Sequence, residues 1–333
     1  MPASFREILR SDRIMFFDGG MGTQLTERGA ERSPAANVHA PDAVLAVHRA
    51  YREAGADVLL TNTLTASRPA LARSGEADQL ARYVAAGCAL ARKAAALAGP
   101  FDGAQGRPAF GSEAQARREN GRMGGFVAGD IGPAGELLEP YGTMTEAAMR
   151  AAFEETARLL AAGGVDLYVV ETMSDIREMT LAVAACRAAA KELPVAATMA
   201  FDPSRQGGFR TSMGVSPTDA ARAMAAAGAD IVGANCGAIT PEQMAEVVRE
   251  FRRATGRPVT ILAQPNAGLP ELRAGQTVFG LSPEAFAAGM MQVLAAGARL
   301  VGGCCGTTPA HIAALVAATK QRTNTQRPSK GTQ

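Results

Sequence analysis

Several common signals are absent from this sequence. It has no tryptophan and only three histidines, so a histidine-rich metal site is not expected. Its net charge is +2, which is too balanced for a typical nucleic-acid-binding domain. No apolar run is long enough to span a bilayer, and residues 1–10 carry charges where a signal peptide needs an apolar core. These absences predict a cytoplasmic protein that binds neither nucleic acid nor a membrane.

Cysteine is also scarce, and its five residues form an odd number. In a reducing compartment this argues against a disulfide framework and leaves metal binding or catalysis open. Cys88 and Cys186 lie in the middle of predicted helices among alanines, where cysteine behaves as a small buried hydrophobe. The other three, Cys236, Cys304 and Cys305, follow apolar runs.

The sequence does contain a regular alternation of short apolar runs and Ala-rich amphipathic segments. The runs predict strands at 14–17, 58–60, 126–128, 167–170, 195–199, 231–234, 260–263 and 300–303. The segments predict helices at 43–54, 76–97, 146–162, 176–191, 218–227, 241–254, 283–295 and 309–319. Parallel strands need crossover connections, which such helices provide. The pattern therefore predicts one α/β domain over residues 1–320, a (β/α)8 TIM barrel, with an open doubly wound sheet as the structural alternative.

Two segments interrupt this alternation. Residues 99–125 form a polar, glycine-rich excursion from the repeating pattern. Its composition fits either an interface or a mobile surface loop. Residues 321–333 are polar and predict a disordered tail. The sequence has neither a G-x-G-x-x-G motif nor a Walker A motif, so a nucleotide site is not predicted.

Most residues with useful chemistry follow the predicted strands. In a barrel the active site lies at the carboxyl ends of the strands, so these residues are expected to share one rim. They are Asp18, Gly19, Gly20, Asn62, Asp130, Glu171, Asn235, Cys236, Cys304 and Cys305. The site is therefore predicted at this end of the barrel.

The three rim cysteines suit a zinc site. Zn²⁺ takes thiolate sulfur at about 2.3 Å in a tetrahedron, and three protein ligands leave one position open, as in catalytic sites. Glycines on both sides of Cys304-Cys305 allow the turn that both side chains need to reach one ion. The long gap back to Cys236 matches no compact zinc-finger spacing, and a redox dithiol is the alternative for the adjacent pair.

A metal held by three thiolates favours one kind of reaction. The ligands already neutralise the charge of zinc, so the site is a poor Lewis acid for hydrolysis. A thiol with an ordinary pKa of about 8.5 would lose its proton in the open position. The resulting thiolate could attack an activated methyl group and form a thioether. The residues therefore predict a thiol methyltransferase.

A series of motifs runs in order between about residues 12 and 318. They are FDGGMGT at 17–23, AGAD at 54–57, TNT at 61–63, GDIGP at 129–133, ET at 171–172, GANC at 233–236, QPNAG at 264–268 and GGCCGTTP at 302–309. The Gly-Gly-Cys-Cys-Gly block is highly specific. On these motifs the chain resembles the homocysteine S-methyltransferase family, which includes betaine–homocysteine methyltransferase, S-methylmethionine-dependent enzymes and the homocysteine-binding module of cobalamin-dependent methionine synthase. It looks most like that last module.

The resemblance implies methylation of homocysteine to methionine, with a Zn²⁺ cofactor on Cys236, Cys304 and Cys305 that makes these residues catalytic through the metal. It also implies that the Asp18-Gly19-Gly20 turn and Glu171 hold the amino-acid end of homocysteine. Carboxylates suit its ammonium group, and backbone N–H groups suit its carboxylate.

Two asparagines at the rim are weaker candidates. Asn62 and Asn235 could belong to the substrate shell, and support of the surrounding loops is the alternative for both.

The motifs do not identify the methyl donor. No corrinoid-binding Asp-x-His-x-x-Gly motif is present, so a methylcorrinoid donor would have to arrive on a separate protein. Glycine betaine would favour an aromatic cage, and the chain has only four tyrosines, with phenylalanines, to build one. S-methylmethionine and other sulfonium compounds are further candidates. The segment 62–67 also lacks the aromatic residue expected after Asn-Thr in the methionine synthase module.

Two alternatives to this function remain. One is a methyltransferase subunit with a thiol acceptor other than homocysteine. The other is a non-catalytic zinc subunit that docks a corrinoid carrier. The sequence does not decide whether the chain forms a homo-oligomer.

Overall fold

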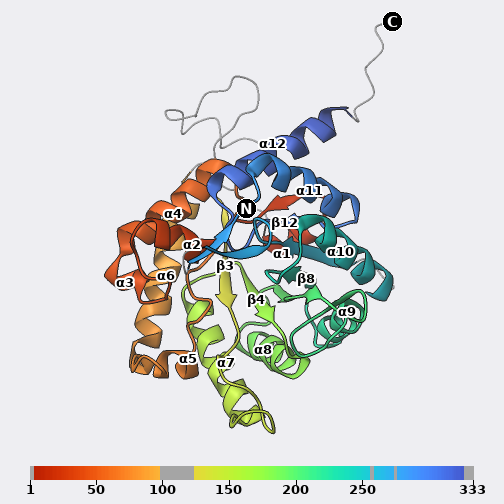
Figure 1. Cartoon of the computed structure of the whole chain (residues 1–333). Helices are drawn as coiled ribbons and strands as arrows, with labels where there is room; N and C mark the ends of the chain where they lie inside the picture. The colour runs from red at the N-terminus through yellow and green to blue at the C-terminus, as the bar shows by residue number, and fades with distance from the viewer. Residues whose placement is uncertain (1–3, 98–123, 256–258, 274–275, 326–333) are drawn as a thin grey trace, which may run out of the picture.

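The structure is a computed structural model that describes residues 4–97, 124–255, 259–273 and 276–325. Parallel strands form one curled sheet with helices around its outside (Figure 1). The strands are β1 (Met15–Phe16), β2 (Val58–Leu60), β3 (Phe126–Ile131), β4 (Leu167–Met173), β5 (Val195–Met199), β8 (Ile231–Asn235), β9 (Thr260–Gln264) and β12 (Leu300–Val301). The predicted barrel is confirmed, and the open doubly wound sheet is wrong.

The helices that follow the strands form the outer layer. They are α4 (Pro41–Ala54), α6 (Leu80–Ala95), α7 (Glu146–Ala162), α8 (Ile176–Ala189), α9 (Pro217–Ala226), α10 (Pro241–Thr255), α11 (Pro283–Ala295) and α12 (Pro309–Thr325). Ser216 and Ser282 cap α9 and α11, and each cap is followed by proline in the first helical turn. A serine cap followed by proline is a typical start of an α-helix, which explains where these two helices begin.

The barrel closes between its first and second strands. The sheet has the order β1-β12-β9-β8-β5-β4-β3-β2, and a parallel bridge between Phe17 and Val58 joins its two ends. Across this seam the Asp57 N–H donates to the Phe16 carbonyl at 2.7 Å, and the Asp18 N–H donates to the Val58 carbonyl at 3.1 Å. Closure brings the carboxyl ends of all these strands to one rim.

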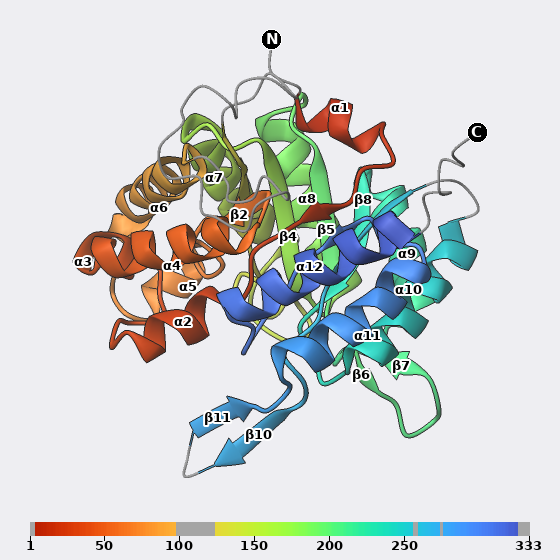
Figure 2. The ribbon, with the colours of Figure 1, turned by 90° about the horizontal axis from the view of Figure 1, so that it is seen from above.

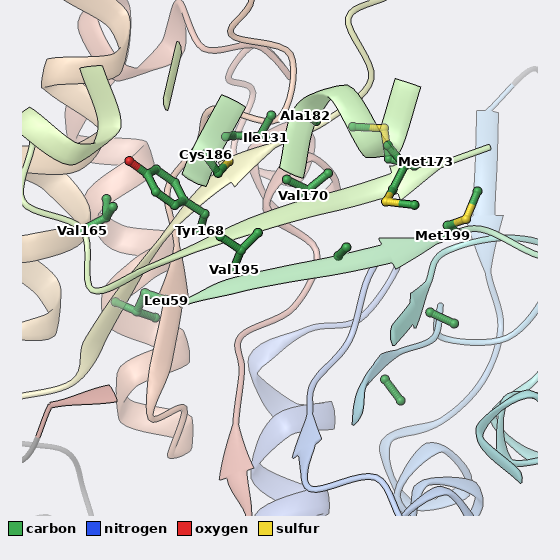
Figure 3. Packing of buried hydrophobic residues seen from close by; sticks show 14 of the residues in the cluster. Leu59, Ile131, Val165, Tyr168, Val170, Met173, Ala182, Cys186, Val195 and Met199 are labelled. Atoms are coloured by element: carbon green, nitrogen blue, oxygen red, sulfur yellow. The ribbon is translucent and has the colours of Figure 1, made fainter. Parts of the chain in front are cut away.

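Two apolar layers hold the barrel together, because successive side chains of a strand point to opposite faces. The inner layer contains Met15, Phe17, Val58, Phe126, Ala128, Leu167, Val169, Ala196, Ile231, Leu262 and Leu300. Figure 3 shows part of the outer layer, where Tyr168 and Val170 of β4 lie with Ala182 and Cys186 of α8. The buried position predicted for Cys186 is confirmed, and Cys88 is buried in the same layer.

The amino-terminal end of the barrel is closed by packing and hydrogen bonds. Helix α1 (Phe5–Leu9) places the Phe5 ring edge-on to Phe126, with ring centroids 5.0 Å apart. Aspartates in the helix-to-strand turns accept N–H groups from neighbouring strands. The pairs are Asp57 with Phe16, Asp166 with Val127, and Asp230 with Val195, at 3.0, 2.8 and 2.9 Å. This end is therefore built for stability, which leaves the opposite rim for chemistry.

Several elements fall outside the repeating pattern and were not predicted. They are α1, α2 (Met21–Glu27), α3 (Ala36–His39), α5 (Arg68–Ala72), the β6–β7 hairpin (Asp202–Pro203 and Phe209–Arg210) and the β10–β11 hairpin (Pro270–Arg273 and Gln276–Phe279). Figure 2 shows the β10–β11 hairpin extending away from the barrel.

The two irregular segments are only partly described. Helix α12 continues to Thr325, past the boundary at 320 that the sequence suggested, so residues 321–325 are helical. The rest of the predicted tail lies outside the described residues, as does the predicted excursion at 99–125 apart from Gly124 and Gly125. In the part of the chain that the structure describes, no helix combines the length and apolarity needed to cross a bilayer.

Candidate active site

A cavity of about 340 Å³ opens at the carboxyl ends of the strands. Small-molecule sites typically span roughly 300–1,000 Å³, so this one suits a small ligand. Its polar side chains include those of Asp18, Asp130, Glu171, Asn62, Gln264, Arg32, Cys304 and Cys305. The cavity therefore combines acidic groups and thiols from strands far apart in the sequence.

The three rim cysteines meet beside this cavity. The Sγ atoms of Cys236, Cys304 and Cys305 all lie within 4.8 Å of one another. Zinc–sulfur bonds of about 2.3 Å in a tetrahedron place sulfur atoms about 3.8 Å apart, so a small adjustment would bring the three atoms onto one ion. The described residues contain no other group of three potential metal ligands this close together.

The backbone holds these cysteines in place. The Cys236 N–H donates to the Gln264 carbonyl at 3.1 Å, and the Cys304 N–H donates to the Pro265 carbonyl at 2.9 Å. The Cys305 carbonyl accepts the Ala267 N–H at 3.0 Å. The segment after β9 thus organises ligands that come from β8 and β12.

The thiols share protons when they are free of metal. Hydrogen bonds from the Cys236 and Cys304 thiols lower the pKa of Cys305 to about 3. The hydrogen bonds with Cys236 and Cys305 raise the pKa of Cys304 well above its usual value. The proton affinities of the three thiols therefore depend on one another, and metal binding would displace their protons.

Asn235 is fully buried between β4, β5 and the cysteines. Its Nδ2 group donates to Thr172 Oγ1 at 2.7 Å and to Cys304 Sγ at 3.8 Å. Its Oδ1 atom accepts from the Thr172 N–H at 2.8 Å and from Thr198 Oγ1 at 2.6 Å. These bonds occupy both the NH₂ group and the carbonyl oxygen of the side-chain amide. Asn235 is not among the residues that line the cavity.

Those bonds also coincide with unusual backbone geometry. Thr172 and Cys236 have φ angles of 60° and 55°, in the left-handed region that side chains other than glycine rarely adopt. Such strain persists only where surrounding contacts fix the backbone, and it concentrates at functional sites. The Asn235 amide supplies such contacts for Thr172.

The Asp18-Gly19-Gly20 turn packs directly against the cysteine loop. The Asp18 carbonyl accepts the Gly303 N–H at 3.0 Å, and the Gly20 N–H donates to Thr307 Oγ1 at 3.0 Å. A Cβ atom on Gly20 would lie 2.8 Å from the Cys304 carbonyl oxygen, and one on Gly19 would collide with Thr307. The glycines are therefore needed for this close approach.

Three buried carboxyl groups line the cavity. Burial and, as the smaller cause, the charge of Cys236 raise the pKa of Glu171 to about 8. Burial raises the pKa of Asp130 well above its usual value, as do the charges of Glu171 and Asp18. Burial also raises the pKa of Asp18, although the Leu60 N–H donates to its Oδ2 atom at 3.0 Å. Because like charges this close resist ionisation, the cavity favours a cationic ligand.

Asn62 lines the cavity from the end of β2. Its Nδ2 group donates to the Ser33 carbonyl at 2.9 Å and to Asn37 Oδ1 at 3.1 Å. These bonds tie the β2 end to the segment before α3 and still leave the residue at the cavity wall.

Sequence reasoning placed Asp130 at the rim but gave it no role, and it missed Arg32 and Gln264. Asp130 could have been found because it ends a buried strand beside Glu171. Gln264 is the last residue of β9, and strand ends point to the site in this fold. Arg32 carries no such signal, because it lies in an irregular segment between α2 and α3.

Comparison with known proteins bears directly on this arrangement. A family model described as homocysteine S-methyltransferase matches residues 15–319. The chain belongs to the homocysteine S-methyltransferase family. The resemblance predicted from the motifs is therefore confirmed.

Relatives within the family differ in length. Methionine synthase from Mycobacterium tuberculosis is 33% identical over 96% of this chain, but the match covers 25% of that protein. The chain thus spans about a quarter of this relative. Betaine–homocysteine S-methyltransferase 1 from Bos taurus is 28% identical over 93% of this chain and 73% of that protein.

A solved family structure shares the fold. The metallated form of the homocysteine methyltransferase MmuM from Escherichia coli aligns with a TM-score of 0.69 and 26% identity. The alignment covers 94% of this chain and 99% of that one. The barrel described above is therefore the fold of the family.

Proposed function

We propose that this chain is a zinc-dependent S-methyltransferase that converts homocysteine to methionine. The observation that carries the proposal is the cluster of Cys236, Cys304 and Cys305, whose Sγ atoms lie within 4.8 Å of one another beside an acidic cavity. Soft thiolate donors select zinc over hard cations, and the family membership points to homocysteine as the acceptor.

Cys236, Cys304 and Cys305 would hold the metal. When bound there, Zn²⁺ supplies an open fourth position where the substrate thiol becomes a thiolate at neutral pH. Asn235 keeps Cys304 oriented through its Nδ2–H bond to the sulfur. Outer hydrogen bonds of this kind fix the direction of a ligand and tune the metal site.

The acidic wall would position the amino-acid end of homocysteine. Glu171 and Asp18 line the cavity, and an ammonium group would relieve the repulsion among the carboxyl groups there. We assign the substrate carboxylate to the Gly19-Gly20 turn, which lines the same cavity. Asn62 would form another part of the cavity wall. This orientation presents the sulfur toward the cysteines.

The methyl donor has three candidate classes, which are a sulfonium compound, betaine and a methylcorrinoid carried by a partner protein. The described residues that line the cavity include no phenylalanine, tyrosine or tryptophan. A quaternary ammonium group is usually held in an aromatic cage, so this wall favours the other two classes over betaine. The methionine synthase relatives, which are about four times longer, support a separate corrinoid protein as partner. Thiols that must stay reduced to bind metal suit the cytoplasm.

A methyl-donor screen tests the function. The zinc-loaded chain is incubated with homocysteine and glycine betaine, S-methylmethionine, dimethylsulfoniopropionate or free methylcobalamin, and methionine is detected by mass spectrometry. Methionine from one donor would support the proposal and identify the donor. If the chain binds homocysteine but none of these donors yields methionine, the donor would be a methylcorrinoid carried by a partner protein. If such a partner also yields no methionine, the chain would be a non-catalytic subunit.

Two controls make the screen specific. The Cys304→Ala chain should give no methionine, whereas Cys88→Ala, which removes a buried thiol far from the cluster, should match the unmutated chain. A chain that binds zinc but not homocysteine would contradict the acceptor and leave another thiol to be sought.

A further inference from the structure

Asp130 stands out among the buried acids of the barrel. It is the penultimate residue of β3 and is 5% exposed. Among the described residues, its Oδ1 atom is the one carboxylate oxygen shut off from solvent that has no hydrogen-bond partner. Burying an unpaired carboxylate is costly, and native structures rarely leave such an oxygen without a purpose.

The backbone of Asp130 is firmly held while its side chain is not. The Asp130 N–H donates to Thr61 Oγ1 at 3.0 Å, and Thr63 Oγ1 donates to the Asp130 carbonyl at 2.7 Å. The two threonine hydroxyls are themselves 2.6 Å apart. This clamp fixes where the carboxyl group points without satisfying it, as expected of a group arranged to meet a ligand.

Two other buried acids of the barrel, Glu178 and Asp18, do have protein partners. Glu178 is 8% exposed, and its Oε1 atom accepts the Ala134 N–H at 2.8 Å. Asp18 uses its Oδ2 atom for the Leu60 N–H. Asp130 instead lines the cavity together with Glu171 and the cysteines, and because its Oδ1 atom is shut off from solvent, its Oδ2 atom is the one available to a ligand.

An α-ammonium group has three N–H donors, and the cavity offers three carboxyl groups. Glu171 has no hydrogen-bond partner recorded among the described side chains, and Asp18 retains one carboxylate oxygen beyond its bond to Leu60. Asp130 supplies the third acceptor. We propose that Asp130 accepts a hydrogen bond from the α-ammonium group of the acceptor and makes the site selective for amino-acid thiols. This inference rests on homocysteine as the acceptor in the proposed function.

The test compares two thiols that differ only in the amino group. Homocysteine and 4-sulfanylbutanoate have the same chain length, thiol and carboxylate, so their affinities report on the ammonium contact alone. Dissociation constants for the zinc-loaded chain are measured by calorimetry for the unmutated protein, Asp130→Asn and the control Glu178→Gln. Zinc content is measured for each sample to show that the cysteine cluster is intact.

We expect Asp130→Asn to affect the binding of the two thiols differently. Asp130→Asn should weaken homocysteine binding by about 10- to 100-fold, the range for a charge-assisted hydrogen bond, and change 4-sulfanylbutanoate binding by less than about twofold. Glu178→Gln should leave the ratio of the two affinities unchanged. Equal losses for both thiols after Asp130→Asn would show a structural role and overturn the inference, as would no loss for either.

Thermal unfolding supplies a second readout. Replacing a buried carboxyl group that lacks a partner should leave the melting temperature of the ligand-free chain unchanged or raise it, while the stabilisation by homocysteine shrinks. A lower melting temperature with unchanged homocysteine affinity would mark Asp130 as purely structural.

Two other outcomes separate this inference from the proposed function. If the KM for the methyl donor rises while homocysteine affinity is unchanged, Asp130 serves the donor and the inference is wrong, although the function stands. If the unmutated zinc-loaded chain binds neither thiol, the acceptor assignment and the role of Asp130 fall together.

Discussion

Replacing Asn235 with alanine is the sharpest test of how the barrel holds its cysteine cluster. The amide of this fully buried residue joins β4, β5 and the sulfur of Cys304. The substitution leaves the three cysteines in place and removes the amide that makes these hydrogen bonds. It therefore separates support of the metal site from the three thiols themselves.

The structure sets the size of the expected effect. Asn235→Ala leaves the buried Thr198 hydroxyl and the part-buried Thr172 N–H without their acceptor. A buried group left unsatisfied costs roughly 1–3 kcal/mol, so the Thr198 hydroxyl alone should lower the free energy of unfolding of the metal-free chain by about 1–3 kcal/mol, and the Thr172 N–H adds to this loss. Loss of the bond to Cys304 should weaken zinc binding by about 10- to 100-fold, as for other outer-shell partners of metal ligands.

The assay combines a zinc titration against a competing chelator with urea unfolding of the metal-free chain. Asn62→Ala is the matched control, because Asn62 is also a rim amide but bonds to Ser33 and Asn37 rather than to a cysteine. It should leave zinc affinity unchanged. Unchanged zinc affinity in Asn235→Ala would refute the reasoning, and an equal loss in both variants would show general loosening of the rim.

Three further predictions concern the site. Cys304→Ala and Cys305→Ala should each lose zinc and activity with an unchanged far-ultraviolet circular dichroism spectrum; stoichiometric zinc in either variant would remove that residue from the ligand set. Glu171→Gln should weaken homocysteine binding by about 1.5–3 kcal/mol in calorimetry, the range for a charge-assisted bond, and an unchanged affinity would exclude Glu171 from the ammonium site. The third concerns pH. Because the folded-state pKa of Glu171 is raised from 4.5 to about 8, the folded chain binds the extra proton between these values. The metal-free chain should then lose stability as pH rises from 4.5 to 8. Glu171→Gln should flatten this slope in urea unfolding, and an unchanged slope would show that another group is responsible.

The sequence by itself determined the repeating architecture and the order of the strands, although β3 and β4 run three residues past their predicted ends. Alternating apolar runs and amphipathic segments are local patterns, so the bounds of β2, β5 and α7 agree with those predicted. Because active sites of this fold lie where the strands end, the same reading singled out Glu171 and the cysteines without any knowledge of their contacts.

Only the tertiary structure decided how those residues meet. Asn235 and Cys304 are 69 positions apart, and their contact depends on barrel closure and strand register, which no local pattern records. The same holds for the hydrogen bond that commits one oxygen of Asp18 to Leu60, and for the unpaired oxygen of Asp130. A side chain's partners are set by what the folded chain brings to it from elsewhere. The sequence can therefore place an acid at the rim, but only the closed barrel shows whether its carboxyl group is used by the protein or left for a ligand.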